Sequence, residues 1–413
     1  MKSSFEFFTR VAYFHNGRGS AQREADNFYA LKPLNIPMYK LIDLFSGCGG
    51  MTLGFTDPYF SGGFVSVFAI DHDRAASASY SLNFGYHAVC GDIEKWISGK
   101  YAIPKADIVI GGPPCQGFSL LNKERMGDVR RALWQPYMDI VEMCGASVFV
   151  IENVQGLLNS PEHQAITKRA GELGFNTIGK ILNAADYGTP QTRIRAFIFG
   201  WKKEFSAFVP FSPEKTHTQG NDLTGRPSWR TVRDVIADLP VPQGKEVRNV
   251  PPPLDLHFGR TPTDKSLERY KAVPPGGNRF DLQKNAPELT PDCWIRKTSG
   301  GTDLFGRLWW DRPSVTIRTE FFKPEKGRYL HPEQHRPITH REAARLMGFP
   351  DDFRFSGTKV EIAKQIGNAV PPPLAGAVAR HVRALMDEWL DSTLTVPHIV
   401  TDVAKRGEVA LSI

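Results

Sequence analysis

Short apolar runs alternate with amphipathic stretches between residues 39 and 200, and this alternation is the main structural signal of the chain. Apolar runs that end in glycine-rich or polar turns are typical of strands in a covered parallel sheet. Strands are predicted at 40–45, 64–70, 108–110, 148–151, 177–182 and 196–200, and helices at 73–84 and 133–144. Strands that alternate with helices predict an α/β fold whose parallel sheet is covered on both faces.

The pattern changes near residue 200. Residues 201–310 hold 13 prolines in 110 positions, against a usual share of about 5%. Their apolar and aromatic content argues against a solvated linker. After 310, a capping box at 339–342 and a long helix opened by the prolines 371–373 restore order. We expect a loop-rich domain inserted in a larger one, which gives the ranges 1–38 (extension), 39–200 with 311–395 (catalytic domain), 201–310 (inserted domain) and 396–413 (tail).

Charge and cysteine content add weaker constraints. Lys and Arg number 51 against 44 Asp and Glu, a net charge of +7, which suits a polyanionic partner but also many other basic enzymes. Five widely spaced cysteines without a Cys-x-x-Cys pair argue against disulfides and structural zinc and favour a reducing compartment. With no secretion signal and no membrane-spanning run, we expect a cytoplasmic protein without membrane or metal partners.

A thiol and a carboxylate follow two neighbouring predicted strands. Cys115 lies in the turn Gly-Gly-Pro-Pro-Cys-Gln-Gly-Phe-Ser at 111–119, and Glu152 follows the run 148–151. Carboxyl ends of parallel strands meet at one sheet edge, so the two side chains are expected to face one crevice. Free cysteines are often inert core residues, but a polar, glycine-rich loop is a poor place for packing. The pair suits nucleophilic addition to a ring with proton transfer beside it.

Other polar motifs are expected at the same edge. Asp71 ends the second strand, 21 residues after the glycine turn 46–50, a spacing typical of an acid that binds a ribose. The turn lacks the Gly-x-Gly-x-x-Gly spacing, which argues against a nicotinamide cofactor. Asp92 is a further carboxylate, or a helix cap. Arg193 and Arg195, two apart in extended chain, are expected to point the same way toward a base oxygen and a phosphate, or into solvent. Residues 367–371 are expected to form a loop before the last helix.

Together these motifs resemble those of the C5-cytosine DNA methyltransferases. The ordered set is 43–50, 111–119, 152–154, 191–195 and 367–371, and residues 128–133 resemble the end of the family's mobile catalytic loop. The resemblance covers 40–200 and 310–390. One departure is Asp71, where the family often has glutamate.

The resemblance implies a seven-stranded, doubly wound methyltransferase fold, S-adenosyl-L-methionine as cofactor and double-stranded DNA as partner of a monomer. Two contexts stay open: a restriction-modification system, in which an endonuclease acting on the same site is a further partner, or a solitary enzyme without one. The implied catalytic residues are Cys115, Glu152, Arg193 and Arg195. The implied cofactor contacts are Phe45, Ser46, Gly47, Cys48, Gly49, Gly50, Asp71, His72, Asp92, Ile93, Pro114, Leu133, Asn368 and Ala369, and the implied catalytic loop includes Gln116, Phe118, Ser119, Asp128 and Arg130.

The implied chemistry starts with the Cys115 thiolate, which attacks C6 so that C5 becomes nucleophilic. Glu152 hydrogen-bonds or protonates N3, and Arg195 holds O2, of a cytosine flipped out of the duplex. Residues 201–310 would read the DNA site, with Arg279, Arg296 and Arg307 as candidate contacts. Three alternatives stay open: an RNA cytosine methyltransferase of the same fold, a catalytically silent DNA-binding relative and, more distantly, a nicotinamide-dependent oxidoreductase.

Overall fold

A seven-stranded sheet forms the centre of residues 39–202 in the described part of the chain. The structure, a computed structural model, describes residues 38–114, 133–205, 212–220, 224–296 and 300–394. The strands are β1 Tyr39–Leu44, β2 Phe64–Asp71, β3 Ala88–Cys90, β4 Ile108–Gly111, β5 Val148–Asn153, β6 Phe175–Asn183 and β7 Ile194–Lys202. Their order is β3-β2-β1-β4-β5-β7-β6, and only β7 runs antiparallel to its neighbours. The predicted mostly parallel α/β sheet is confirmed.

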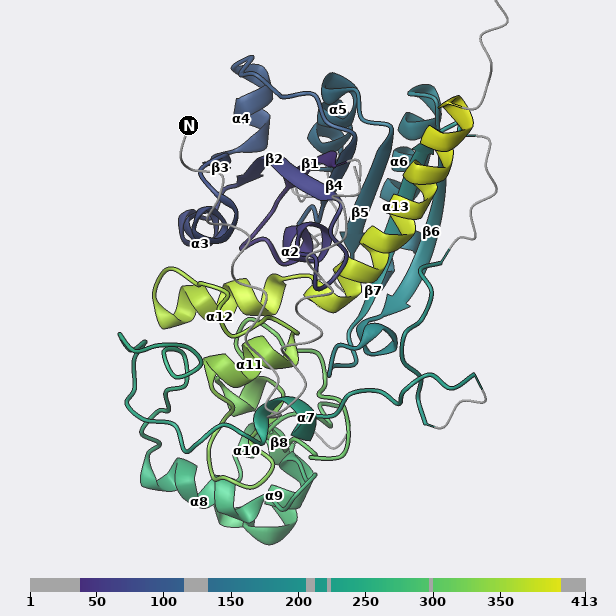
Figure 1. The fold of residues 1–413 in the computed structure, drawn as a ribbon. Coiled ribbons are helices and arrows are strands. Elements are labelled where there is room, and N and C mark those ends of the chain that lie inside the picture. Colours follow the sequence, from purple (N-terminus) through teal and green to yellow (C-terminus); the bar gives the residue numbers. More distant parts are fainter. Residues whose placement is uncertain (1–37, 115–132, 206–211, 221–223, 297–299, 395–413) are drawn as a thin grey trace, which may run out of the picture. The chain divides into compact units, whose positions relative to one another are not determined.

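Side-chain alternation along the strands divides the buried residues between the two sheet faces. On one face, α2 Gly50–Thr56 and α13 Pro372–Leu394 pack with Leu41, Ile108 and Val148. On the other, α4 Ile93–Ser98, α5 Trp134–Cys144 and α6 Pro161–Glu172 pack with Ile42, Val109 and Phe149. Figure 1 shows α13 running along the sheet. A further helix, α3 Arg74–Phe84, follows β2 in the sequence.

A further apolar cluster joins two distant parts of the sequence. It contains Val232, Leu256 and Phe258 together with Ile317, Leu346 and Ile366. Leu346 belongs to α11 His340–Leu346 and Ile366 to α12 Lys359–Asn368. The capping box predicted at the start of α11 is present: Thr339 accepts from Glu342 N, and the Glu342 side chain accepts from Thr339 N.

Residues 201–310 contain short elements. The helices described there are α7 Arg233–Ile236, α8 Asp264–Ala272, α9 Arg279–Asn285 and α10 Asp292–Ile295, and β8 Gly306–Arg307 pairs with β9 Arg328–Leu330. Single-turn 3-10 helices complete the order: η2 Gln155–Asn159, η3 Ala184–Tyr187, η4 Pro287–Leu289 and η5 Pro324–Lys326. Among all these described residues, no helix has the length and apolar character needed to cross a membrane.

Several elements differ from the predictions. The sequence patterns gave no strand at β3 and no helix at α4, α6 or α12. Gly367 and Asn368, expected in a loop, are the last residues of α12, so the loop before α13 is only Ala369 to Pro371. The reason is the second capping box at Thr358 and Glu361, which starts a helix that continues to this loop.

Candidate active site

Four parallel strands end at one edge of the sheet, and several of the expected site residues that the structure describes lie there. The last residues of β1, β2, β4 and β5 are Leu44, Asp71, Gly111 and Asn153. β1 lies between β2 and β4, so the direction of winding reverses between β1 and β4. Such a switch point is where open α/β sheets bind ligands.

The glycine turn after β1 approaches its surroundings closely. Phe45 has φ 56° and Gly49 has φ 90°, left-handed conformations that are costly for a side chain such as that of Phe45. A Cβ atom on Gly49 would lie 2.3 Å from the Phe84 ring. The chain therefore needs glycine at 49 to turn from β1 into α2.

Asp71 holds this turn in place. Its Oδ2 accepts from Gly47 N at 2.8 Å and its Oδ1 accepts from Asp73 N at 2.8 Å, while the exposed His72 ring lies 3.5 Å from Oδ1. Burial raises the pKa of Asp71, and the two backbone N–H groups oppose that rise. Each carboxylate oxygen can accept more than one hydrogen bond, so Asp71 can still bind hydroxyl groups.

The loop before α13 lies against the same turn. A Cβ atom on Gly50 would be 2.6 Å from the Val370 carbonyl oxygen and 3.1 Å from Ala369 Cβ. Asn368 is exposed beside it. The structure thus brings 46–50 and 368–370 together, although they are more than 300 residues apart in the sequence.

The remaining expected cofactor contacts lie along the same edge. Asp92 is exposed, and its Oδ1 caps α4 by accepting from Glu94 N and Lys95 N; the cap interpretation is confirmed. The Ile93 side chain is buried among residues such as Phe68. Leu133 is the N-cap residue of α5 and Pro114 is partly buried. The Cys48 thiol is buried, which raises its pKa to about 12, so it stays protonated.

Glu152 and Arg195 form an ion pair at the end of β5. Arg195 Nε lies 3.1 Å from Glu152 Oε1, with both side chains largely buried. Burial raises the pKa of Glu152, whereas Arg195 and then Arg193 lower it. The other carboxyl oxygen, Oε2, would be only 3.2 Å from a Cβ atom on Gly112, so the glycine leaves room for the carboxyl group.

Asn153 connects this pair to the Pro-Pro turn. Its Nδ2 donates to Pro113 O at 3.0 Å, and the side chain is only 2% exposed. This bond sets the direction of the chain two residues before Cys115. Cys115 itself and the expected loop residues Gln116, Phe118, Ser119, Asp128 and Arg130 lie outside the described residues.

Arg193 does not share the position of Arg195. Its guanidinium is 2% exposed and donates to Ile317 O and Gly367 O, each at 3.1 Å. These two hydrogen bonds hold the segments around Ile317 and Gly367 against Arg193. The expectation that Arg193 contacts a base or a phosphate is therefore corrected. Asp43, the first residue of the motif 43–50, was assigned no individual role from the sequence. It is buried in β1, where Thr52 Oγ1 donates to it at 2.6 Å and burial raises its pKa to about 7. An acid inside an apolar run was the available signal.

Two of the three arginines proposed to contact DNA are also buried. Arg279 is 0% and Arg307 2% exposed. The Arg307 guanidinium donates to the carbonyl oxygens of Val273, Tyr270, His331 and Gln334. These side chains hold loops together and are unavailable to DNA in this arrangement, whereas Arg296 is exposed.

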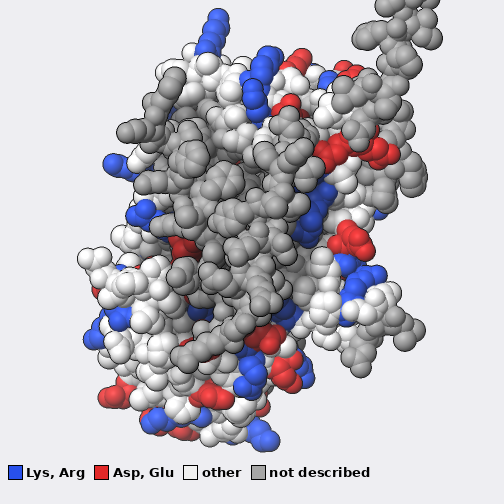
Figure 2. Space-filling model, in the orientation of Figure 1, with Lys and Arg blue, Asp and Glu red and all other residues white. Residues whose placement is uncertain are grey.

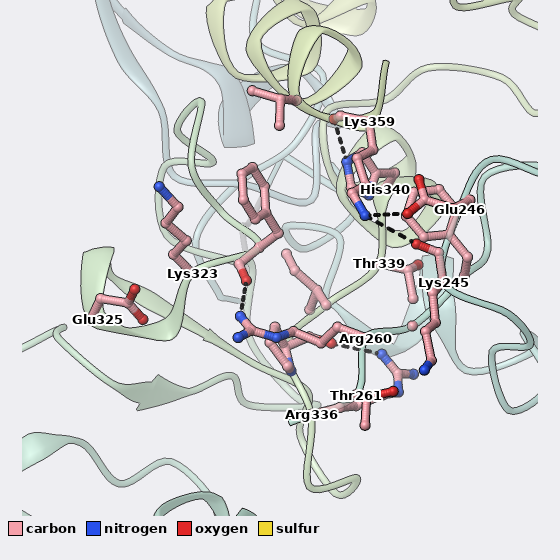
Figure 3. A pocket seen from close by; sticks show the side chains of 16 residues that line it. Lys245, Glu246, Arg260, Thr261, Lys323, Glu325, Arg336, Thr339, His340 and Lys359 are labelled. Atoms are coloured by element: carbon pink, nitrogen blue, oxygen red, sulfur yellow. Dashed lines mark hydrogen bonds and ion pairs between the residues drawn. The ribbon is translucent and has the colours of Figure 1, made fainter. Parts of the chain in front are cut away.

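A separate pocket of about 490 Å³ includes none of the expected site residues. Its aromatic floor has His340 stacked on Phe258, with ring centroids 4.6 Å apart. Figure 3 shows basic side chains around it. Lys359 pairs with Glu246, Arg336 with Glu342 and Lys323 with Glu320, so acidic partners offset much of that charge. Within the described ranges, no group of three or more His, Cys, Asp or Glu side chains could hold a metal ion.

Comparison with known proteins identifies the family of this arrangement. Residues 39–384 match the family described as C-5 cytosine-specific DNA methylase. Type II methyltransferase M1.HphI of Haemophilus parahaemolyticus is 35% identical, with 83% of this chain and 86% of the relative covered. Type II methyltransferase M.NgoFVII of Neisseria gonorrhoeae is 32% identical, with 84% and 87% covered.

A solved structure shows the same fold. It is a protein encoded within an E. coli prophage and described as a DNA modification methyltransferase, with a TM-score of 0.63 and 25% identity over 84% of this chain and 99% of that chain. The family and the fold expected from the sequence motifs are therefore confirmed. The chain belongs to the C-5 cytosine-specific DNA methylase family and is a DNA (cytosine-5) methyltransferase.

Proposed function

We propose that this enzyme methylates C5 of a cytosine flipped out of a specific duplex DNA site, with Cys115 as the nucleophile. The observation that supports this assignment most is the Asn153–Pro113 hydrogen bond of 3.0 Å, beside the Glu152–Arg195 ion pair. It ties Pro113, two residues before Cys115 in the sequence, to the residue that follows Glu152.

The proposed reaction forms and breaks bonds in the following order. The Cys115 thiolate forms a bond to C6, and the electron pair displaced from the C5–C6 double bond increases the nucleophilicity of C5. Glu152, whose pKa burial raises, delivers or shares a proton at N3, and Arg195 donates to O2. After C5 gains the methyl group, loss of its proton and of the thiolate restores the aromatic ring.

The edge residues fit S-adenosyl-L-methionine, which supplies an electrophilic methyl group on sulfur when bound. Asp71 would accept hydrogen bonds from the ribose hydroxyls, and the turn 46–50 would face the ligand with backbone rather than side chains. The close contact of Gly50 with Val370 and Ala369 positions Asn368 and Ala369 at the rim of this site. Asp92 would act through the carboxylate oxygen that does not cap α4.

Site reading is proposed for residues 201–310, and the exposed Arg296 stays a candidate DNA contact. The relatives M1.HphI and M.NgoFVII carry the name Type II methyltransferase. We infer from these names that this enzyme protects DNA against a restriction endonuclease of the same specificity. Bisulfite sequencing of DNA from cells that make the protein would give the modified site.

Methyl transfer from radiolabelled S-adenosyl-L-methionine, with duplex DNA and RNA compared as acceptors, tests the proposed activity. We expect label in DNA only, confined to 5-methylcytosine. Label in RNA alone would favour the RNA-modifying alternative, and cofactor and DNA binding without transfer would favour a silent relative.

A further inference from the structure

Residues 312–318, here called the 312–318 strip, run beside the segment that leads into the catalytic pair. Ser314 N donates to Pro190 O and Thr192 N donates to Ser314 O, each at 2.9 Å. Ile317 N donates to the buried Gln191 Oε1 at 2.9 Å, and Arg193 Nη1 donates to Ile317 O at 3.1 Å. The backbone of the strip is therefore bonded to residues 190–193 along much of its length.

These bonds fix the strip relative to the site. Residues 190–193 end two residues before Arg195, which pairs with Glu152. Arg193 also donates to Gly367 O, and a Cβ atom on Gly367 would lie 2.4 Å from Thr319 N. One end of the strip thus packs against the helix that carries Asn368, on the proposed cofactor side.

Two cationic side chains stand exposed at the ends of this fixed backbone. Arg312 and Arg318 are both exposed, and neither forms an ion pair within the residues that the structure describes. Arg312 lies over the Trp309 ring, with its guanidinium 5.1 Å from the ring centroid. They differ from the buried Arg193, Arg279 and Arg307, whose guanidinium groups donate to backbone carbonyls.

The overall charge distribution does not indicate where DNA binds, so the position of individual arginines carries the argument. Figure 2 shows basic and acidic side chains interspersed on the face drawn, with no large area of one sign among the coloured residues. An exposed arginine on a mobile chain loses much side-chain and backbone entropy on binding a phosphate. A backbone already held by several hydrogen bonds avoids part of that cost.

We propose that the 312–318 strip binds the phosphate backbone of DNA next to the target cytosine, with Arg312 and Arg318 as the contacts. The proposal rests on the function proposed above. The six residue-to-residue steps from 312 to 318 span at most about 21 Å of extended chain, which is the axial length of about six base pairs. Because the strip is bonded to the segment before Arg195, these contacts would set the register of the duplex relative to the catalytic pair.

The salt dependence of DNA affinity tests this proposal. Each phosphate contact contributes a slope of about −0.9 in log affinity against log salt. We expect R312A and R318A each to reduce the slope by about that amount, the double variant by about 1.8, and R318K to restore it. The loss should be similar for cognate and non-cognate duplexes, with S-adenosyl-L-methionine affinity unchanged.

The matched control is K168A, which removes an exposed positive charge from α6, outside the strip. It should keep the wild-type slope. If wild-type protein methylates duplex DNA and both arginine variants keep the wild-type slope, the strip proposal alone is wrong. If wild-type protein neither binds nor methylates DNA, the proposed function is wrong and the strip proposal fails with it.

Discussion

Glu152 and Arg195 face each other across two antiparallel strands, with Glu152 Oε1 3.1 Å from Arg195 Nε. The pairing of Asn153 with Ala196 sets this register. A buried carboxyl group next to one guanidinium experiences two opposite influences: burial raises its pKa and the arginine lowers it. Burial has the larger effect, so the pKa of Glu152 is raised, which suits a proton donor to a ring nitrogen.

Replacing Glu152 by glutamine should keep the size and hydrogen bonding of the side chain but remove its ability to transfer a proton. The amide can still hydrogen-bond to N3 but cannot supply a proton, so we expect kcat to fall roughly 10²- to 10⁴-fold. Since the protonated carboxyl is the active form, wild-type kcat should fall as the pH rises through the raised pKa of Glu152, and the variant should not show this fall. Glu172→Gln, on the exposed face of α6, is the control. A variant with the wild-type rate and pH profile would remove Glu152 from proton transfer.

The role of Asp71 is tested by cofactor affinity. Loss of hydrogen bonds to a charged acceptor costs about 1.5–3 kcal/mol, so Asp71→Ala should weaken S-adenosyl-L-methionine binding roughly ten- to a hundredfold. Asp71→Glu should bind more tightly than the alanine variant because it restores the carboxylate. Calorimetry that finds equal affinity for wild type and Asp71→Ala would refute the ribose contact, provided that the variant is folded.

Asp43 predicts a pH dependence of stability. Its pKa in the folded protein is about 7, against an ordinary value of 3.8, so between these values the folded state retains a proton that the unfolded chain has lost. Its contribution to stability therefore falls as pH rises from about 4 to 7 and is constant above that. Asp43→Asn should lack this decline and gain on the order of 4 kcal/mol relative to wild type over that range.

Urea unfolding at several pH values measures the Asp43 effect. Asp352→Asn, at an exposed position, is the control and should follow the wild-type curve. A difference between Asp43→Asn and wild type that stays constant from pH 4 to pH 8 would contradict the buried-acid account.

Sequence reasoning performed well where one local pattern determined the structure. The apolar runs around Ile108 and Val148 are strands because both sheet faces are covered, and the capping box at Thr339 starts a helix. The likeness of the glycine turn and of the Cys115 segment to a known family identified the site edge. Thr358 and Glu361 form the same kind of capping box, so the sequence also contains a local signal for the start of α12.

Other features depend on contacts that no local pattern contains. Arg307 resembles a surface arginine in sequence, but the carbonyl groups that bind it come from Tyr270, Val273, His331 and Gln334. The position of Arg193 likewise depends on Ile317 and Gly367, more than 120 residues later. A strand of three residues such as Ala88–Cys90 is too short to show a period.

Exchange of residues 201–310 tests where the DNA site is read. Grafting this segment onto a related enzyme of different specificity should transfer the methylated sequence, because base-edge contacts, not phosphate contacts, carry specificity. Bisulfite sequencing provides the readout. A chimera that methylates at the recipient's original site would place the reading surface elsewhere.

Covalent trapping at Cys115 is the most direct test of the proposed mechanism. In duplex DNA with 5-fluorocytosine at the target position, fluorine cannot leave C5 as a proton does, so the bond from Cys115 to C6 should persist after methyl transfer. We expect wild-type protein with S-adenosyl-L-methionine to form a denaturation-resistant adduct with this DNA, and mass spectrometry to locate the bond at Cys115. Cys115→Ala should form none and should methylate ordinary DNA at no measurable rate. Near-normal methylation by Cys115→Ala, or an adduct at another residue, would contradict the account.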